Sequence, residues 1–86
     1  VDIDWEFPGQ RGLNNTNRPE DKENCTALMT EARAALDKAG KAAAKHYLLT
    51  MATGANDVWI EHTEMDKMQA SLDFVNIMTY DLYGAW

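Results

Sequence analysis

The sequence has 86 residues, and its 14 acidic and 8 basic side chains give a formal net charge of -6 at pH 7. This acidic balance argues against nucleic acid or an anionic membrane surface as a partner, and no apolar run is long enough to cross a membrane. The single cysteine, Cys25, excludes an internal disulfide and a cysteine-based metal cluster. Because the chain begins inside an apolar run, with no initiating Met and no signal peptide, we expect a segment of a longer protein.

The first seven residues, VDIDWEF, alternate between apolar and acidic side chains. A period of two predicts a β-strand over residues 1–7, with Asp2, Asp4 and Glu6 in a column on one face. The apolar side chains then share the opposite face, against covering helices, and Trp5 is expected in the core. Like charges a pleat apart repel one another, so the column needs an explanation.

Two interpretations of this acidic column remain open. It is either the solvated face of an edge strand or a coupled set of carboxyl groups in a site of low dielectric constant. In a coupled set, adjacent carboxylates cannot all ionise, so they share a proton and one pKa rises. A carboxylic acid that stays protonated near neutral pH is what general acid catalysis requires. Solvated faces usually mix charges with hydroxyls, so the regular column favours the coupled set.

The next elements are a loop and a long helix. Residues 8–19 are rich in Gly, Pro and Asn, which is typical of a loop. Apolar residues then recur at spacings of three and four, which predicts a helix over residues 20–39, with Gly40 as its stop. The inner stripe of this helix is expected to comprise Cys25, Leu28, Met29, Ala32, Ala35, Leu36 and Ala39. Cys25 is therefore interpreted as a small apolar residue of the helix face, without a reactive role.

Two further strands and a second helix complete the pattern. Residues 47–53 form a short apolar run that predicts a buried strand, and residues 74–80 predict another. Between them, Asn56 or Asp57 is expected to cap a second helix. The inner face of this second helix should comprise Ile60, Met65, Met68 and Leu72. Alternating strands and helices with near-continuous apolar strands predict an α/β fold, in which helices cover a parallel sheet.

The third strand adds side chains to the acidic column. Asn76, Met78 and Tyr80 share one parity, so the Tyr80 phenol is expected at the same carboxyl-terminal end of the sheet as Glu6. Asp81 follows at the end of that strand. In α/β barrels the active site lies at this end of the strands.

Two segments of the sequence resemble motifs of family 18 glycoside hydrolases, the chitinases. VDIDWE resembles the second half of the D-G-x-D-x-D-x-E strand of that family, and IMTYDLYGAW resembles its M-x-Y-D strand at Met78, Tyr80 and Asp81. RPEDKENCT and YLLTMATGA resemble the helix and strand between the two motifs, so the resemblance covers the whole chain. It implies a fragment of a (β/α)8 TIM barrel, about strands four to six with two intervening helices. Residues 1–86 are then an incomplete catalytic domain.

The resemblance also implies a reaction. Family 18 enzymes depart from the two-carboxylate scheme of glycosidases: the 2-acetamido oxygen of the substrate attacks the anomeric carbon and forms an oxazolinium ion, and configuration is retained. By resemblance, Glu6 is the acid and then the base, while Asp4 orients the acetamido N–H. Asp2 shares a proton with Asp4, and Tyr80 binds the acetamido carbonyl. Further substrate contacts are expected at Met78, Asp81, Phe7, Ala52 and Trp86.

The implied partners are chitin and N-acetylglucosamine oligomers, which the full-length enzyme would hydrolyse as a secreted monomer. No cofactor and no metal are implied, and His46 and His62 lack the spacing of metal ligands, so both are interpreted as surface residues. The rival readings are a chitinase-like lectin, an endo-β-N-acetylglucosaminidase and a purely structural α/β fragment. An intact Glu6 argues against the lectin, and the acidic column argues against the structural fragment. The isolated chain is expected to be inactive and to fold with little cooperativity.

Overall fold

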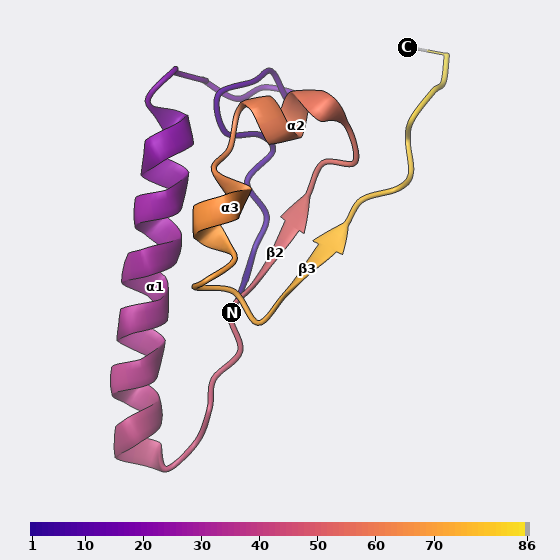
Figure 1. Ribbon diagram of the computed structural model, residues 1–86. Coiled ribbons are helices and arrows are strands. Elements are labelled where there is room, and N and C mark those ends of the chain that lie inside the picture. Colours follow the sequence, from indigo (N-terminus) through magenta and orange to yellow (C-terminus); the bar gives the residue numbers. More distant parts are fainter. Residues whose placement is uncertain (86) are drawn as a thin grey trace.

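The computed structural model describes residues 1–85, which form a parallel sheet of three strands in the order β1-β2-β3 (Figure 1). The strands are β1 (Asp2–Ile3), β2 (Thr50–Thr53) and β3 (Phe74–Ile77). The helices are α1 (Asp21–Ala43), which links the first two strands, and α2 (Asp57–Glu61) and α3 (Met65–Met68), which link the last two. The parallel α/β arrangement predicted from the sequence is confirmed.

The helices cover one face of the sheet. Figure 1 shows α1 and α3 side by side, on one side of β2 and β3, and the two helices are in contact. The buried core joins them to β2 and comprises Cys25, Met29, Leu49, Met51, Trp59 and Met68. The apolar side chains of the first segment, Ile3, Trp5 and Phe7, pack against this core. The predicted alternation is therefore confirmed, and the acidic side chains of that segment are exposed on the other side.

The strands are shorter than the sequence predicts. Only Asp2 and Ile3 of residues 1–7 pair with β2, because the chain bends away from the sheet towards the loop. The ladder of β2 begins at Thr50 rather than at residue 47, and β3 ends at Ile77 rather than at residue 80. One further bond, from the Met78 N–H to the Thr53 carbonyl at 2.9 Å, extends the pairing beyond β3.

The predicted end of the long helix at Gly40 is wrong, because α1 continues to Ala43 and ends at Ala44, whose φ is 53°. Gly40 is needed inside the helix for a different reason: a Cβ at this position would lie 2.3 Å from the Lys45 carbonyl oxygen. The Lys45 N–H donates to the Gly40 carbonyl at 2.9 Å, so the chain folds back directly over this residue. Of the predicted inner stripe, Leu28, Ala35 and Ala39 are exposed instead.

The single second helix predicted from the sequence is also wrong, since two short helices take its place. Asn56 is the N-cap of α2, because its side chain accepts a bond from the Trp59 N–H at 2.9 Å. Just after the end of α2, the Thr63 hydroxyl donates to the Trp59 carbonyl at 2.7 Å. Ile60, predicted on the inner face, is 61% exposed, and Trp59 occupies the core instead. Of the described residues, no helix is both long and apolar enough to cross a membrane.

Candidate active site

The acidic side chains of the first segment lie on the face of the sheet that the helices leave uncovered. Asp2, Asp4 and Glu6 are all exposed there. Asp2 is held from the neighbouring strand, because the Thr50 hydroxyl donates to its Oδ1 at 2.6 Å. Asp4 lies beside Glu6, whose pKa it raises. The column predicted from the sequence is thus present, with Glu6 beyond the carboxyl-terminal end of β1.

The surroundings of Glu6 favour its protonated form. Partial burial, the negative charge of Asp4 and the hydrogen bond to Asp4 all raise the pKa of the Glu6 carboxyl above its ordinary value. Loss of solvation is the largest of these causes. Two neighbouring carboxyl groups that share a hydrogen bond hold a proton between them more readily than either would alone. The arrangement can therefore supply a proton to a bound molecule.

A cavity of about 270 Å³ brings Glu6 together with residues from the end of β3. Its lining includes five of the predicted site residues: Glu6, Phe7, Met78, Tyr80 and Asp81. Gly54, Ala55, Asn56 and Leu82 complete the lining. The sequence motifs near the two ends of the chain therefore converge in space. A second cavity, of about 640 Å³, also borders Glu6, Phe7 and Asp81.

The other predicted residues lie outside these cavities. Asp2, Asp4 and Ala52 line neither of them. Ala52 pairs in register with Asn76 and lies two residues after Thr50, so it shares the face of the carboxyl column, where it is buried. Trp86, predicted as a sugar contact, lies outside the described residues.

The loop that follows Glu6 is held by two polar side chains that sequence reasoning did not assign to the site. The Asn15 amide donates to the carbonyl oxygens of Phe7 and Gln10 at 3.3 and 3.0 Å. Asp21 Oδ2 accepts bonds from the N–H groups of Gly9 and Arg18 at 3.0 and 2.9 Å. These backbone bonds lower the pKa of Asp21, which keeps it ionised as an acceptor. An acidic residue in the first helical turn was the only sequence signal for Asp21.

Close backbone contact also shapes this loop. A Cβ at Gly12 would lie 2.1 Å from the carbonyl oxygen of Glu6, so no larger residue fits there without moving the acid. On the other side, the ring of Phe7 meets that of Trp59 edge to face, with centroids 6.3 Å apart. Glu6 is therefore located between a tight loop and the apolar core.

Metal-ligating side chains do not gather within residues 1–85: no group of three or more His, Cys, Asp or Glu residues there could hold a metal ion. His46 is exposed, as predicted, whereas His62 is half-buried and its Nδ1 lies 2.9 Å from the Val58 carbonyl. Cys25 is fully buried in the core, which confirms its place on the apolar face of the helix, and burial raises the pKa of its thiol to about 11.

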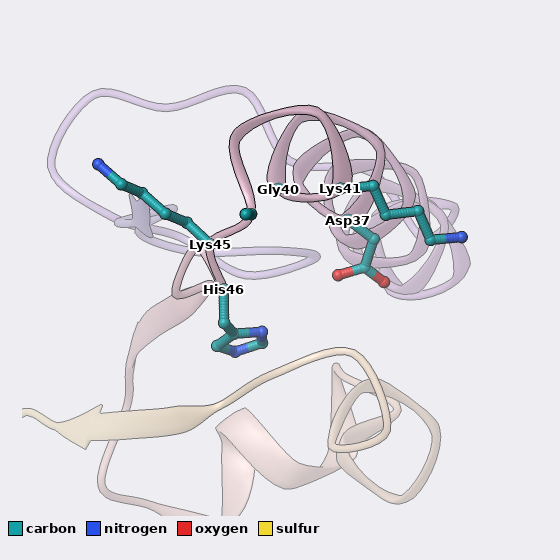
Figure 2. Close-up of a pocket in the computed structure, with 6 residues that line it drawn as sticks. Asp37, Gly40, Lys41, Lys45 and His46 are labelled. Atoms are coloured by element: carbon teal, nitrogen blue, oxygen red, sulfur yellow. The ribbon is translucent and has the colours of Figure 1, made fainter.

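A third cavity, of about 480 Å³, lies at the opposite end of the sheet, where α1 ends (Figure 2). Asp37, Gly40, Lys41, Ala44, Lys45 and His46 line it. Figure 2 shows the side chains of Lys41 and Lys45 pointing in opposite directions, away from one another. Because these two amines do not converge, the geometry of this cavity does not define a binding site.

The chain matches known proteins over its whole length. The profile of the glycosyl hydrolases family 18 matches residues 1–86. Chitinase A1 of Niallia circulans is 51% identical over 87 residues, a match that covers 100% of this chain and 12% of that protein. Chitotriosidase-1 of Mus musculus is 37% identical, and that match covers 99% of this chain and 18% of that protein.

Solved structures give the same result for the fold. Chitinase ChiA74 of Bacillus thuringiensis matches with a TM-score of 0.95 and 49% identity, over 100% of this chain and 14% of that one. A glycoside hydrolase family 18 N-acetylglucosaminidase of Paenibacillus barengoltzii also matches with a TM-score of 0.95, at 44% identity over 100% of this chain and 25% of that one. The chain thus spans a quarter or less of each of these relatives.

Proposed function

The chain belongs to glycosyl hydrolase family 18, and on that premise we propose that the protein of which it forms part is a chitinase. It hydrolyses the β-1,4 linkages between N-acetylglucosamine units of chitin and its oligomers. The observation that carries this proposal is the cavity in which Glu6, with its raised pKa, meets Tyr80, Met78 and Asp81. A protonated acid beside a phenol and a second carboxylate is chemically matched to a sugar with an acetamido group.

The proposed reaction is retaining and assisted by the substrate. Glu6 protonates the leaving glycosidic oxygen, and the acetamido oxygen of the substrate attacks the anomeric carbon to form an oxazolinium ion. Glu6, now ionised, removes a proton from the water that opens this ion. Asp4 lies beside Glu6, whose pKa it raises, and in the proposed reaction Asp4 turns from Glu6 to the acetamido N–H.

The remaining residues bind and orient the substrate in this proposal. Tyr80 donates to the acetamido carbonyl, and Met78 and Phe7 form apolar walls of the cavity. Asp81 accepts a bond from a sugar hydroxyl. Asp2 shares a proton with Asp4, which allows Asp4 to turn between its two neighbours. Ala52 leaves room beside the column, and Trp86 offers a stacking surface for a further sugar.

The chain supplies only part of the catalytic domain. Family 18 implies a TIM barrel, which takes about 250 residues to close, and we assign this chain to about strands four to six of its eight. Both β1 and β3 are edges of the sheet here, and Ile77 of β3 is 58% exposed. We therefore expect the isolated chain to be inactive and to show no sharp thermal transition. The whole enzyme is proposed to act as a secreted monomer.

A short N-acetylglucosamine oligomer tests the proposal. The anomeric protons of the products are followed by NMR for the whole enzyme and for its Glu6→Gln variant. The expected result is β-anomer formed first, with the rate reduced by about 10²- to 10⁴-fold in the variant, as for loss of a general acid. Initial α-anomer contradicts the retaining reaction. A Glu6→Gln variant that cleaves at the rate of the unmodified enzyme would show that another residue is the acid.

A second candidate is an N-acetylglucosaminidase, because the structural relative from P. barengoltzii is one. The same experiment separates the two. Release of single sugars alone, or cleavage of glycoprotein glycans in place of chitin oligomers, favours the second candidate. A protein that binds the oligomer without cleaving it is a lectin.

A further inference from the structure

We propose that Thr50 is a positioning residue for the carboxyl column, because its hydroxyl fixes Asp2 from the neighbouring strand. Thr50 lies outside the sequence motifs, and the proposed reaction does not use it. The inference rests on the proposed function, since it concerns how the column is oriented for that reaction.

The contact is built into the register of the sheet. Asp2 and Thr50 are paired residues of β1 and β2, so their side chains leave the sheet side by side on the same face. The Thr50 N–H donates to the Val1 carbonyl at 2.9 Å, and the Thr50 hydroxyl donates to Asp2 Oδ1 at 2.6 Å. Thr50 is only 6% exposed, and a β-branched side chain has few rotamers, so the hydroxyl has little freedom to turn elsewhere.

The hydroxyl of Thr26 also donates to a distant carboxylate, Glu64 Oε1 at 2.8 Å, whereas two other threonines bond locally. The hydroxyls of Thr30 and Thr63 donate to the carbonyl oxygen four residues earlier, at 3.0 and 2.7 Å, which is the usual local partner in a helix. Thr50 instead reaches a carboxylate that is 48 residues away in the sequence. A hydroxyl that donates to a carboxylate makes a stronger bond than one that donates to a carbonyl.

This bond has a consequence for Asp4. A hydroxyl carries one proton, and Thr50 gives it to Oδ1 of Asp2, so Asp2 remains an acceptor with a fixed orientation. Asp4 lies beside Glu6 and raises its pKa. In the proposed reaction Asp4 turns from Glu6 to the substrate. The carboxyl of Asp2 is then already held in the orientation in which it shares a proton with Asp4. Without the hydroxyl, Asp2 can rotate, and Asp4 loses a partner of defined position.

Three variants of the whole enzyme test this role. Thr50→Val keeps the shape and removes the hydroxyl, Thr50→Ser keeps the hydroxyl, and Thr63→Val removes another buried hydroxyl, which donates to the Trp59 carbonyl. We expect Thr50→Val to lower kcat for a chitin oligomer about tenfold, the effect of one lost hydrogen bond to a charged group, with little change in KM. Thr50→Ser should restore kcat, and Thr63→Val should lose thermal stability with kcat unchanged.

Several results would overturn the proposal. One is a Thr50→Val enzyme with unaltered kcat, and another is a Thr50→Ser enzyme as slow as Thr50→Val. A fall in kcat of the same size in Thr63→Val would assign the effect to stability alone.

Crystal structures of the same variants separate this inference from the proposed function. If the unmodified enzyme does not cleave N-acetylglucosamine oligomers, the proposed function fails, and the orientation of Asp2 then decides the role of Thr50. A rotated Asp2 carboxylate in Thr50→Val, restored in Thr50→Ser, supports the positioning role. An Asp2 carboxylate that stays in place in Thr50→Val contradicts it.

Discussion

At the carboxyl-terminal end of the sheet, Glu6 has another carboxyl group, that of Asp4, as its neighbour, whereas at the amino-terminal end Asp73 is bonded to the basic side chains of Arg33 and His46. Asp73 Oδ2 accepts from Arg33 Nη1 at 3.0 Å and from the Leu49 N–H at 2.8 Å, and its Oδ1 lies 2.6 Å from His46 Nε2. These contacts, the Leu49 bond first, lower the pKa of Asp73, while the pKa of Glu6 is raised. The pKa values of these two acidic side chains are thus shifted in opposite directions.

The difference teaches what each end is built for. The Asp73 contacts join α1, the start of β2 and the start of β3, so an ionised carboxylate there holds three elements together. The cavity of about 270 Å³ beside Glu6 has no cation in its lining, which consists of apolar, amide, phenol and carboxyl groups, whereas Arg11 lines the second cavity. A carboxyl group without a compensating cation contributes little to stability and is available for proton transfer.

Replacing Asp4 should have the largest effect, because it reduces the difference between the pKa shifts of Glu6 and Asp73. Asp4→Asn removes the charge and the hydrogen bond that help to raise the pKa of Glu6, so that pKa should fall. Because the reaction needs protonated Glu6, the basic limb of the pH profile of kcat/KM should move to lower pH. We also expect kcat to fall about a hundredfold, as for the loss of one group that stabilises developing charge.

The control for Asp4→Asn is Asp73→Asn, at the other end of the sheet. It should leave the pH profile unchanged. A basic limb that stays in place in Asp4→Asn would show that Asp4 does not govern the protonation of Glu6.

Replacing Tyr80, at the same end of the sheet as Glu6, should lower kcat by a smaller factor. Tyr80 lines the cavity with Glu6 and is 64% exposed, so Tyr80→Phe should fold normally. We expect kcat to fall about tenfold with a smaller change in KM, since in the proposed reaction the phenol bonds a carbonyl whose charge changes.

Tyr83→Phe is the matched control, because Tyr83 is 92% exposed and lies outside that cavity lining. Equal kinetic constants for Tyr80→Phe and Tyr83→Phe would show that the Tyr80 hydroxyl has no role in the reaction. A rise in KM alone would limit Tyr80 to substrate binding.

Replacing Asp73 should change stability and leave the chemistry intact. A lowered pKa means that the Asp73 carboxylate stabilises the fold above its unfolded-state pKa of about 3.9 and that this contribution is lost as pH falls through the lower folded-state value. Asp73→Asn should therefore unfold at lower urea concentration at neutral pH and lose less further stability on acidification. Urea midpoints across this pH range measure the effect, with Asp37→Asn as the control, since Asp37 pairs only with the same arginine. Parallel pH dependences for Asp73→Asn and the unmodified enzyme would be inconsistent with this role.

Local patterns in the sequence predict much of this site. The alternation in VDIDWEF assigns each side chain to its face, because the side-chain period of a strand depends only on its backbone. The parity of Met78 and Tyr80 correctly predicts that they meet Glu6 at one end of the sheet.

Long-range contacts explain what the sequence does not predict. The role of Thr50 depends on the register between β1 and β2, and Gly40 is required by the fold-back of the chain at Lys45 rather than as the end of α1. The second helix divides in two because Trp59, and not Ile60, enters the core. None of these contacts has a signature within a few residues of the chain.

A carboxyl ¹³C NMR titration of Glu6 and Asp73 in the whole enzyme tests the account most directly. The account predicts that Glu6 titrates above the ordinary glutamate value of about 4.3, and Asp73 below the ordinary aspartate value of about 3.9. A Glu6 carboxyl that titrates at or below its ordinary value would contradict the account, because no proton would then be held where the proposed reaction needs it.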